Sequence, residues 1–402
     1  MRARSYDGRV SGSGPFGGGA GNPFEGLFGE LAKLLSNQGP VNLEVARQMS
    51  HWLATEGQAE PNPDPVERMR YEELVRVADL HVAEVTGLTT TVTGRLLTVD
   101  PVGRAEWARR TLEAYRPLFE GLAEGLSAAT AEGDEPPPDD PAAAMFGGVT
   151  EVVGPLLLGI QAGSMVGHLA RRALGEYELP VPRPASDQLV LVPVNVTEFA
   201  SDWSLSLDDV RLWLCLNEIT HHAVLGRPHV RARLDGLLRS YVAGFRPDPH
   251  AFEDKLTALD PTDPSSFQAV LGEPGELLGA METPEQRLIL ARIEALTAAL
   301  EGYTDHVMDG VGQTLVSGYG ALVEALRRRR AERGDGERFV ARLFGLDVGP
   351  AQYERGRTFV KGVVERAGEE GLARLWRSER ELPTPAEVDA PGLWLERIDL
   401  PD

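Results

Sequence analysis

The stretch LWLCLNEITHHAVLG, residues 212–226, decides which fold and which chemistry the chain is expected to have. It lies in a predicted helix that begins after Ser206, with Asp209 at the spacing of a capping box, and ends at Gly226. Apolar residues cover most sides of this helix, so we expect it to be largely buried. Within it, NEITH matches the pattern H-E-x-x-H except that Asn217 stands at the first position.

Asn217, Glu218 and His221 lie on one side of the predicted helix. Asn217 and His221 are about 40 degrees apart around the axis, and Glu218 and His221 about 60 degrees. In a zinc peptidase, two histidines four residues apart bind the metal, and the carboxylate after the first takes a proton from metal-bound water. The pattern therefore makes Glu218 the candidate general base and His221 a candidate metal ligand. Asn217 is a weaker candidate ligand, because a neutral amide binds zinc less well than imidazole.

Two other interpretations of the same residues stay open. A glutamate and two histidines in a buried helix also form hydrogen-bonded polar clusters that bind no metal. Glu218 and His221 form E-x-x-H as well, the unit of di-iron carboxylate sites, but no second E-x-x-H lies at a comparable helical position. His222 is expected to pair with Glu218, four positions back, and to support the site rather than bind metal.

Composition excludes several classes of function. The chain has 402 residues, 42% of them hydrophobic, and a formal charge of −21, which argues against nucleic acid or an anionic membrane as the main partner. Its one cysteine, Cys215, excludes an intramolecular disulfide. The N-terminus has no apolar signal segment, so we expect a cytoplasmic protein. The basic run LRRRR, residues 326–330, is expected to be a solvated helix face.

The rest of the chain predicts a mainly α fold. We expect a flexible Gly-rich tail at residues 1–21, a helical region at 22–131, a second helical region carrying the motif at 142–380, and a C-terminal tail at 381–402. The clearest strand signal lies at residues 187–200, where Pro193 favours an edge strand or an irregular segment.

The apolar segment at residues 145–174 does not predict a membrane span. Glu151 and His168 interrupt it, and no apolar run approaches about 18 residues. We expect instead a buried helix whose Gly163 and Gly167 allow another helix to approach closely.

Five stretches carry a resemblance to a known family. They are NPFEGLFGELAKLLSNQGPVNLEVARQ (22–48), VPVNVTEFASDWSL (192–205), LNEITHHAVLGRPHVRARL (216–234), LEGYTDHVMDGVG (300–312) and LRRRRAERGDGERFVARLFGLD (326–347). On them the chain resembles the zincin-like hydrolase family, whose members are described as zinc-dependent metalloproteases or as a domain of unknown function. The resemblance covers most of residues 22–376.

The resemblance implies a zincin-like helical fold and assigns roles to four residues. His221 matches the second histidine ligand and Glu218 the general base, while Asn217 stands where the first ligand belongs. Glu301, in the helix that contains EGYTDHVMD, is expected as the third ligand, because zincins of the glutamate type take it from a helix after the motif.

Two functions follow as expectations. The first is a zincin-like protein whose degenerate motif leaves it weakly catalytic or non-catalytic, retained as a scaffold that binds a peptide or small-molecule ligand. The alternative is an active zinc-dependent hydrolase of peptide or amide bonds, with Glu218 as the general base. Zinc is the one cofactor expected.

Overall fold

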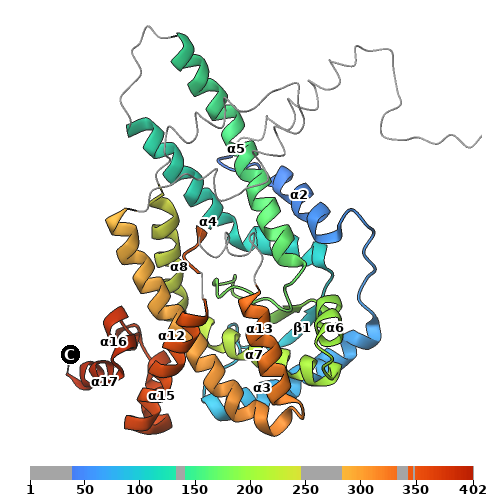
Figure 1. Cartoon of the computed structure of the whole chain (residues 1–402), viewed down its shortest axis with the longest axis vertical. Helices are drawn as coiled ribbons and strands as arrows, with labels where there is room; N and C mark the ends of the chain where they lie inside the picture. The colour runs from blue at the N-terminus through green and yellow to red at the C-terminus, as the bar shows by residue number, and fades with distance from the viewer. Residues whose placement is uncertain (1–38, 133–140, 246–282, 333–342, 347–348, 402) are drawn as a thin grey trace, which may run out of the picture. The chain divides into compact units, whose positions relative to one another are not determined.

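The computed structural model describes residues 39–132, 141–245, 283–332, 343–346 and 349–401. Over this part of the chain the fold is mainly α, which confirms the prediction (Figure 1). The α-helices are α2 (Leu43–Thr55), α3 (Pro65–Thr86), α4 (Arg104–Glu132), α5 (Pro141–Ala170), α6 (Pro193–Asp202), α7 (Leu207–Leu225), α8 (Pro228–Ala243), α12 (Pro284–Leu315), α13 (Tyr319–Ala331), α15 (Pro350–Leu372), α16 (Pro385–Asp389) and α17 (Pro391–Asp399).

Two short strands form a parallel sheet. β1 (Thr98–Pro101) pairs with β2 (Gln188–Leu191), with Thr98 opposite Gln188. The predicted strand near residues 187–200 is therefore present but short. Pro193 is the first residue of α6, a position where the missing backbone N–H of proline leaves no hydrogen bond unmade.

The glycines of α5 allow α2 to pack closely against it, as the sequence predicted. A Cβ atom at Gly163 would lie 2.5 Å from the carbonyl oxygen of Ala46, and one at Gly167 would lie 2.7 Å from Cβ of Leu53. Both contacts leave no room for a side chain. Among the described residues, no helix is long and apolar enough to cross a membrane.

Helix α7 lies among α3, α6, α8 and α12, which all pack against it (Figure 1). Its N-cap is Ser206, whose hydroxyl accepts a hydrogen bond from the backbone N–H of Asp209 at 3.3 Å. Every residue from Trp213 to Leu225 is buried. The polar residues of the motif are therefore held in the interior of the protein, where each needs a specific partner.

Helices α12 and α15 cross where two glycines meet. A Cβ atom at Gly356 of α15 would overlap the carbonyl oxygen of Ala298, and one at Gly302 of α12 would overlap the backbone of Gly356. The two backbones are thus in direct contact. Because Glu301 precedes Gly302, this crossing also fixes the position of the Glu301 backbone.

The C-terminal residues differ from the expected tail at 381–402. They form α16 and α17, and Trp394 of α17 is fully buried. The indole N–H of Trp394 donates a hydrogen bond to the carbonyl oxygen of Glu381 at 2.7 Å, so the segment is anchored by its largest side chain. The predicted Gly-rich tail at residues 1–21 lies outside the described residues.

Candidate functional site

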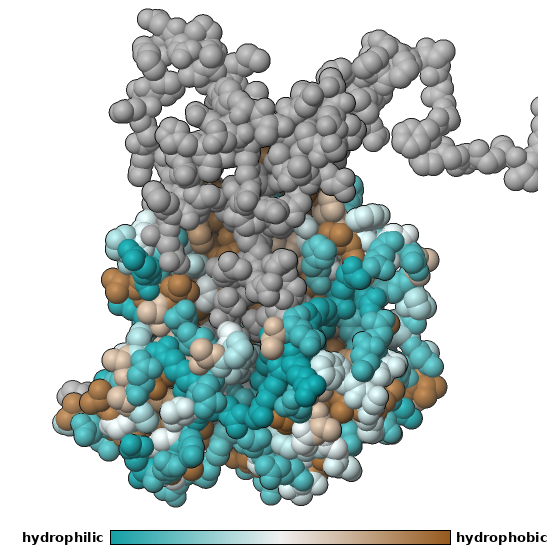
Figure 2. Space-filling view, in the orientation of Figure 1, coloured by the Kyte–Doolittle hydropathy of each residue, from teal (hydrophilic) through white to brown (hydrophobic). Residues whose placement is uncertain are grey.

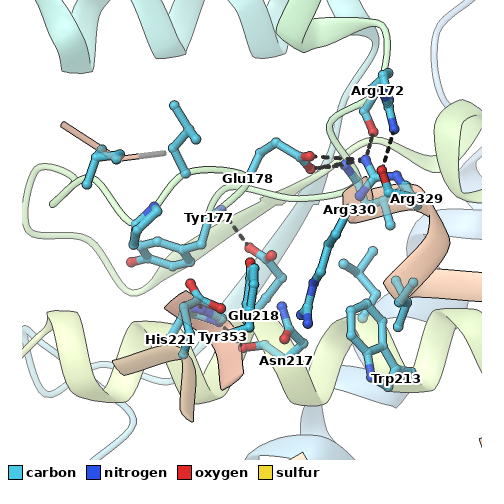
Figure 3. A pocket seen from close by; sticks show the side chains of 17 residues that line it. Arg172, Tyr177, Glu178, Trp213, Asn217, Glu218, His221, Arg329, Arg330 and Tyr353 are labelled. Atoms are coloured by element: carbon cyan, nitrogen blue, oxygen red, sulfur yellow. Dashed lines mark hydrogen bonds and ion pairs between the residues drawn. The ribbon is translucent and has the colours of Figure 1, made fainter. Parts of the chain in front are cut away.

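The predicted site residues line one pocket. Asn217, Glu218 and His221 enter it from α7 and Glu301 from α12. The cavity has a volume of about 80 Å³, and residues of α13, of α15 and of the segment that follows α5 also line it (Figure 3). The structure therefore brings together four residues that the motif and the family resemblance selected.

Glu301 faces His221 across 80 residues of sequence. The distance between Nε2 of His221 and a carboxylate oxygen of Glu301 is 3.4 Å, and both side chains are buried. Nδ1 of His221 lies 3.0 Å from the carbonyl oxygen of Asn217, which only accepts hydrogen bonds, so Nδ1 carries a proton. Burial alone would lower the pKa of His221, but the Glu301 carboxylate, together with Glu218 and the carbonyl oxygen of Asn217, raises the pKa above its usual value.

The spacing of this pair is that of two metal ligands. Two atoms that each lie about 2.0 Å from a tetrahedral zinc ion are separated by about 3.3 Å. The 3.4 Å between His221 and Glu301 is close to this value, and it is longer than the roughly 2.8 Å of a strong charge-assisted hydrogen bond. The geometry is therefore compatible with a pair of zinc ligands at the places that the resemblance implies.

Among the residues that the structure describes, a third protein ligand of comparable strength is missing. Within the described ranges, no group of three or more His, Cys, Asp or Glu side chains is arranged to hold a metal ion. Asn217 lines the same pocket and offers only a neutral amide. The described part of the chain thus supplies two of the three protein ligands that a zinc site of this kind needs.

Glu218 is held by the loop after α5. Its Oε2 atom accepts hydrogen bonds from the backbone N–H groups of Glu176, at 2.8 Å, and Tyr177, at 3.0 Å. Gly175 lies directly against the carboxyl group, since a Cβ atom there would be 2.7 Å from either oxygen. Burial raises the pKa of Glu218 to about 7 despite the opposing charge of His221.

The raised pKa of Glu218 predicts a pH-dependent stability. A carboxyl group whose pKa is 4.5 when unfolded and about 7 when folded stabilises the protein at low pH, and this stability is lost as the pH rises through 7. The full difference corresponds to about 3 kcal/mol. The side chain of Glu218→Gln cannot ionise. In urea unfolding, we therefore expect its free energy of unfolding to fall less than that of the wild type as the pH rises from about 5 to about 8.

The control for this experiment is Glu324→Gln, a half-exposed position on α13. It should leave the pH dependence of unfolding as it is in the wild type. Equal losses of stability in the wild type and in Glu218→Gln would show that Glu218 titrates normally.

Tyr177 connects the residues of the motif and was not predicted. Its ring stacks on His221 with centroids 6.0 Å apart, and its hydroxyl lies 2.8 Å from Nδ1 of His222. Burial lowers the pKa of His222 to about 4 and raises that of Tyr177, so the tyrosine hydroxyl donates to a neutral imidazole. The expected pairing of His222 with Glu218 is therefore replaced by a hydrogen bond with Tyr177.

Two arginines of the basic run also line the pocket, contrary to the expected solvated face. The side chains of Arg329 and Arg330 are 15% and 24% exposed, whereas that of Arg328 is 61% exposed. The helical spacing in α13 turns Arg329 and Arg330 inward. This orientation is not evident from the sequence, because four consecutive arginines leave no apolar residue among them to mark the buried side.

Comparison with known proteins agrees with this fold. The model of a family described as zincin-like metallopeptidase matches residues 41–395. A solved structure from Chloroflexus aurantiacus, described as "a putative hydrolase with a novel fold", is similar with 27% sequence identity and a TM-score of 0.61. The similarity covers 90% of this chain and 100% of that one. No curated protein matches the chain.

Proposed function

Because the chain belongs to the zincin-like metallopeptidase family, we propose that it is a zincin-derived binding protein whose pocket no longer activates water. The observation that carries this proposal is that the Glu218 carboxyl group is buried and accepts hydrogen bonds from the backbone of a neighbouring loop. In a zincin, the residue at this position takes a proton from metal-bound water. Here Glu218 is 2% exposed, and its carboxyl group holds the loop of Glu176 and Tyr177 in place by accepting their backbone hydrogen bonds.

The ligand set supports the same proposal. The family is generally zinc-binding, and His221 and Glu301 keep the spacing of two ligands. Catalytic zinc sites have three protein ligands and an open position for water, and Asn217 replaces the histidine that would be the third. A retained carboxylate without a complete ligand set has no activated water to deprotonate.

The pocket keeps what a binding site requires. It is concave, it is lined by Trp213 and Tyr353 as well as by charged groups, and its polar atoms converge from five parts of the fold. A peptide or a small molecule that places one polar group in the cavity is the ligand class that we propose.

One pair of observations favours the alternative, an active zinc-dependent hydrolase of peptide or amide bonds. The 3.4 Å spacing of His221 and Glu301 suits zinc, and a pKa of about 7 suits a general base at neutral pH. In this function His221, Glu301 and the amide oxygen of Asn217 would hold the metal, which would supply the activated water.

Peptide hydrolysis distinguishes the two functions. Wild type and Glu218→Gln are compared on a library of fluorogenic peptides, with and without added zinc chloride. We expect equal, background rates, because Glu218 has no activated water to act on. A wild-type rate that exceeds that of Glu218→Gln by about 100-fold, the usual contribution of a general base, would establish the hydrolase instead.

A further inference from the structure

Helix α3 carries apolar side chains on its outer side as well as on its inner side. The inner side packs against α7 (Figure 1) and is buried through Tyr71, Val75, Ala78 and Val82. On the outer side, four large apolar side chains lie within about 80 degrees around the helix axis. They are between 44% and 72% exposed and are Val66, Met69, Val77 and Leu80. Packing among the described residues therefore buries only one of the two apolar sides of α3.

Exposed apolar residues alone do not indicate an interface, because they are common on protein surfaces. In Figure 2 hydrophobic residues lie singly or in small groups among hydrophilic ones. The outer side of α3 differs because its residues follow a symmetric order. Seven exposed residues stand at positions −7, −4, −3, 0, +3, +4 and +7 relative to Glu73. We call these seven the outer stripe, and in order they are Val66, Met69, Arg70, Glu73, Arg76, Val77 and Leu80.

This order allows the outer stripe to pair with an antiparallel copy of itself. In a two-fold symmetric dimer every contact occurs twice, so one surface must complement itself. With the axis at Glu73, the two apolar residues before it would pack against the two after it in the second copy. The same apolar cluster then forms at both ends of the interface. Moving the axis by two residues, to Val75, would instead place Leu80 against Arg70 of the second copy.

The charges at the centre of the outer stripe also complement each other. In this pairing Glu73 would lie between Arg70 and Arg76 of the second copy, which stand three residues to either side of the axis. Among the described residues, the Glu73 carboxylate forms no ion pair. Arg76 donates from Nε to the backbone of its own helix, and Arg70 lies 3.7 Å from the carboxylate of Asp208. In the pair of copies, two glutamates and two aspartates would therefore balance four arginines.

We propose that the outer stripe is the interface of an antiparallel homodimer with its two-fold axis at Glu73. The stripe spans 15 residues, roughly 21 Å of helix, and such a helix pair buries less than the roughly 1,200 Å² of standard interfaces. Association is therefore reversible, with half of the chains paired at concentrations on the order of 10 to 100 µM. The inference is independent of the proposed function, because no residue of the outer stripe lines the pocket.

Sedimentation velocity of the full chain over a series of concentrations tests this proposal. We expect the average mass to rise from one chain toward two with increasing concentration, and to return on dilution. Leu80→Glu should weaken the dimer by at least about tenfold, because it places a charge in both apolar clusters. Leu80 is 72% exposed, so the change leaves the fold intact. The matched control is Leu393→Glu on α17, 53% exposed, which should associate as the wild type does.

Cysteine cross-linking tests the orientation and the register. The natural Cys215 is buried, and the chain has no other cysteine. Glu73→Cys places a thiol on the axis and should form disulfide-linked dimers in a glutathione buffer. Met69→Cys should form far fewer, because the two copies of residue 69 would lie roughly 12 Å apart along the helices.

Three results would overturn the proposal. The first is a wild type that stays monomeric up to about 500 µM, which would leave the outer stripe to solvent or to another protein. The second is equal weakening of association by Leu80→Glu and Leu393→Glu. The third is cross-linking of Met69→Cys as efficient as that of Glu73→Cys, which would indicate a parallel pair or random collision.

Discussion

We expect Gly356→Ala to lower the free energy of unfolding by at least about 3 kcal/mol. The added methyl group would overlap the carbonyl oxygen of Ala298, a backbone atom that cannot move as a flexible side chain can. Relief requires α12 and α15 to separate at their crossing, which exposes part of the core. Alanine is the better helix former by about 1 kcal/mol, but this gain is smaller than the cost of separating two packed helices.

The matched control for Gly356→Ala is Gly310→Ala in α12. Gly310 is exposed, and a Cβ atom there would meet nothing within 4 Å. We therefore expect this variant to be as stable as the wild type or more stable, by up to about 1 kcal/mol. Urea unfolding of both variants measures the difference. Equal stability of Gly356→Ala and Gly310→Ala would contradict the direct contact between the backbones of α12 and α15.

The second large effect is expected for Asn217→His. The new imidazole would lie one turn of α7 before His221, and Glu301 already faces His221 at the spacing of a ligand pair. Three strong protein ligands would then be available to zinc. We expect the zinc affinity to rise at least about 100-fold, because even groups outside the ligand shell contribute about 10- to 100-fold. Competition with a chromophoric chelator measures this affinity.

Two variants control for the result at Asn217. Asn217→Ala removes the amide without adding a ligand and should bind zinc no better than the wild type. Adding His221→Ala to Asn217→His should abolish the gain, because the pair of imidazoles is then broken. An unchanged affinity in Asn217→His would mean that His221 and Glu301 are not placed to bind a metal.

Much of the site could be predicted because it lies on one helix. The caps of α7 and its apolar residues fix its limits and its burial, and the 3.6-residue repeat places Asn217, Glu218 and His221 on one side. Glu301 is different, because 80 residues separate it from His221 and no local pattern spans that distance. Only the family resemblance selected it, and the structure places it 3.4 Å from the histidine.

Other parts of the fold depend on contacts that sequence patterns do not show. β1 has four residues, ends in Pro101 and pairs with a strand about 90 residues later. The local sequence is therefore too short to show an alternation of apolar and polar residues, and it does not indicate the pairing strand. The segment expected as a C-terminal tail folds around the buried Trp394. Arg330 sits in a uniform basic run, and only the packing of α13 determines that it faces the pocket.

The zinc content of the purified, tag-free protein shows whether the pocket has lost its metal site. Mass spectrometry counts zinc per chain after incubation with zinc chloride and dialysis, in the wild type and in His221→Ala. The loss of the third ligand predicts far less than one zinc per chain in both proteins. About one zinc per wild-type chain, lost in His221→Ala, would contradict the loss of the metal site and establish that Asn217 still permits zinc binding.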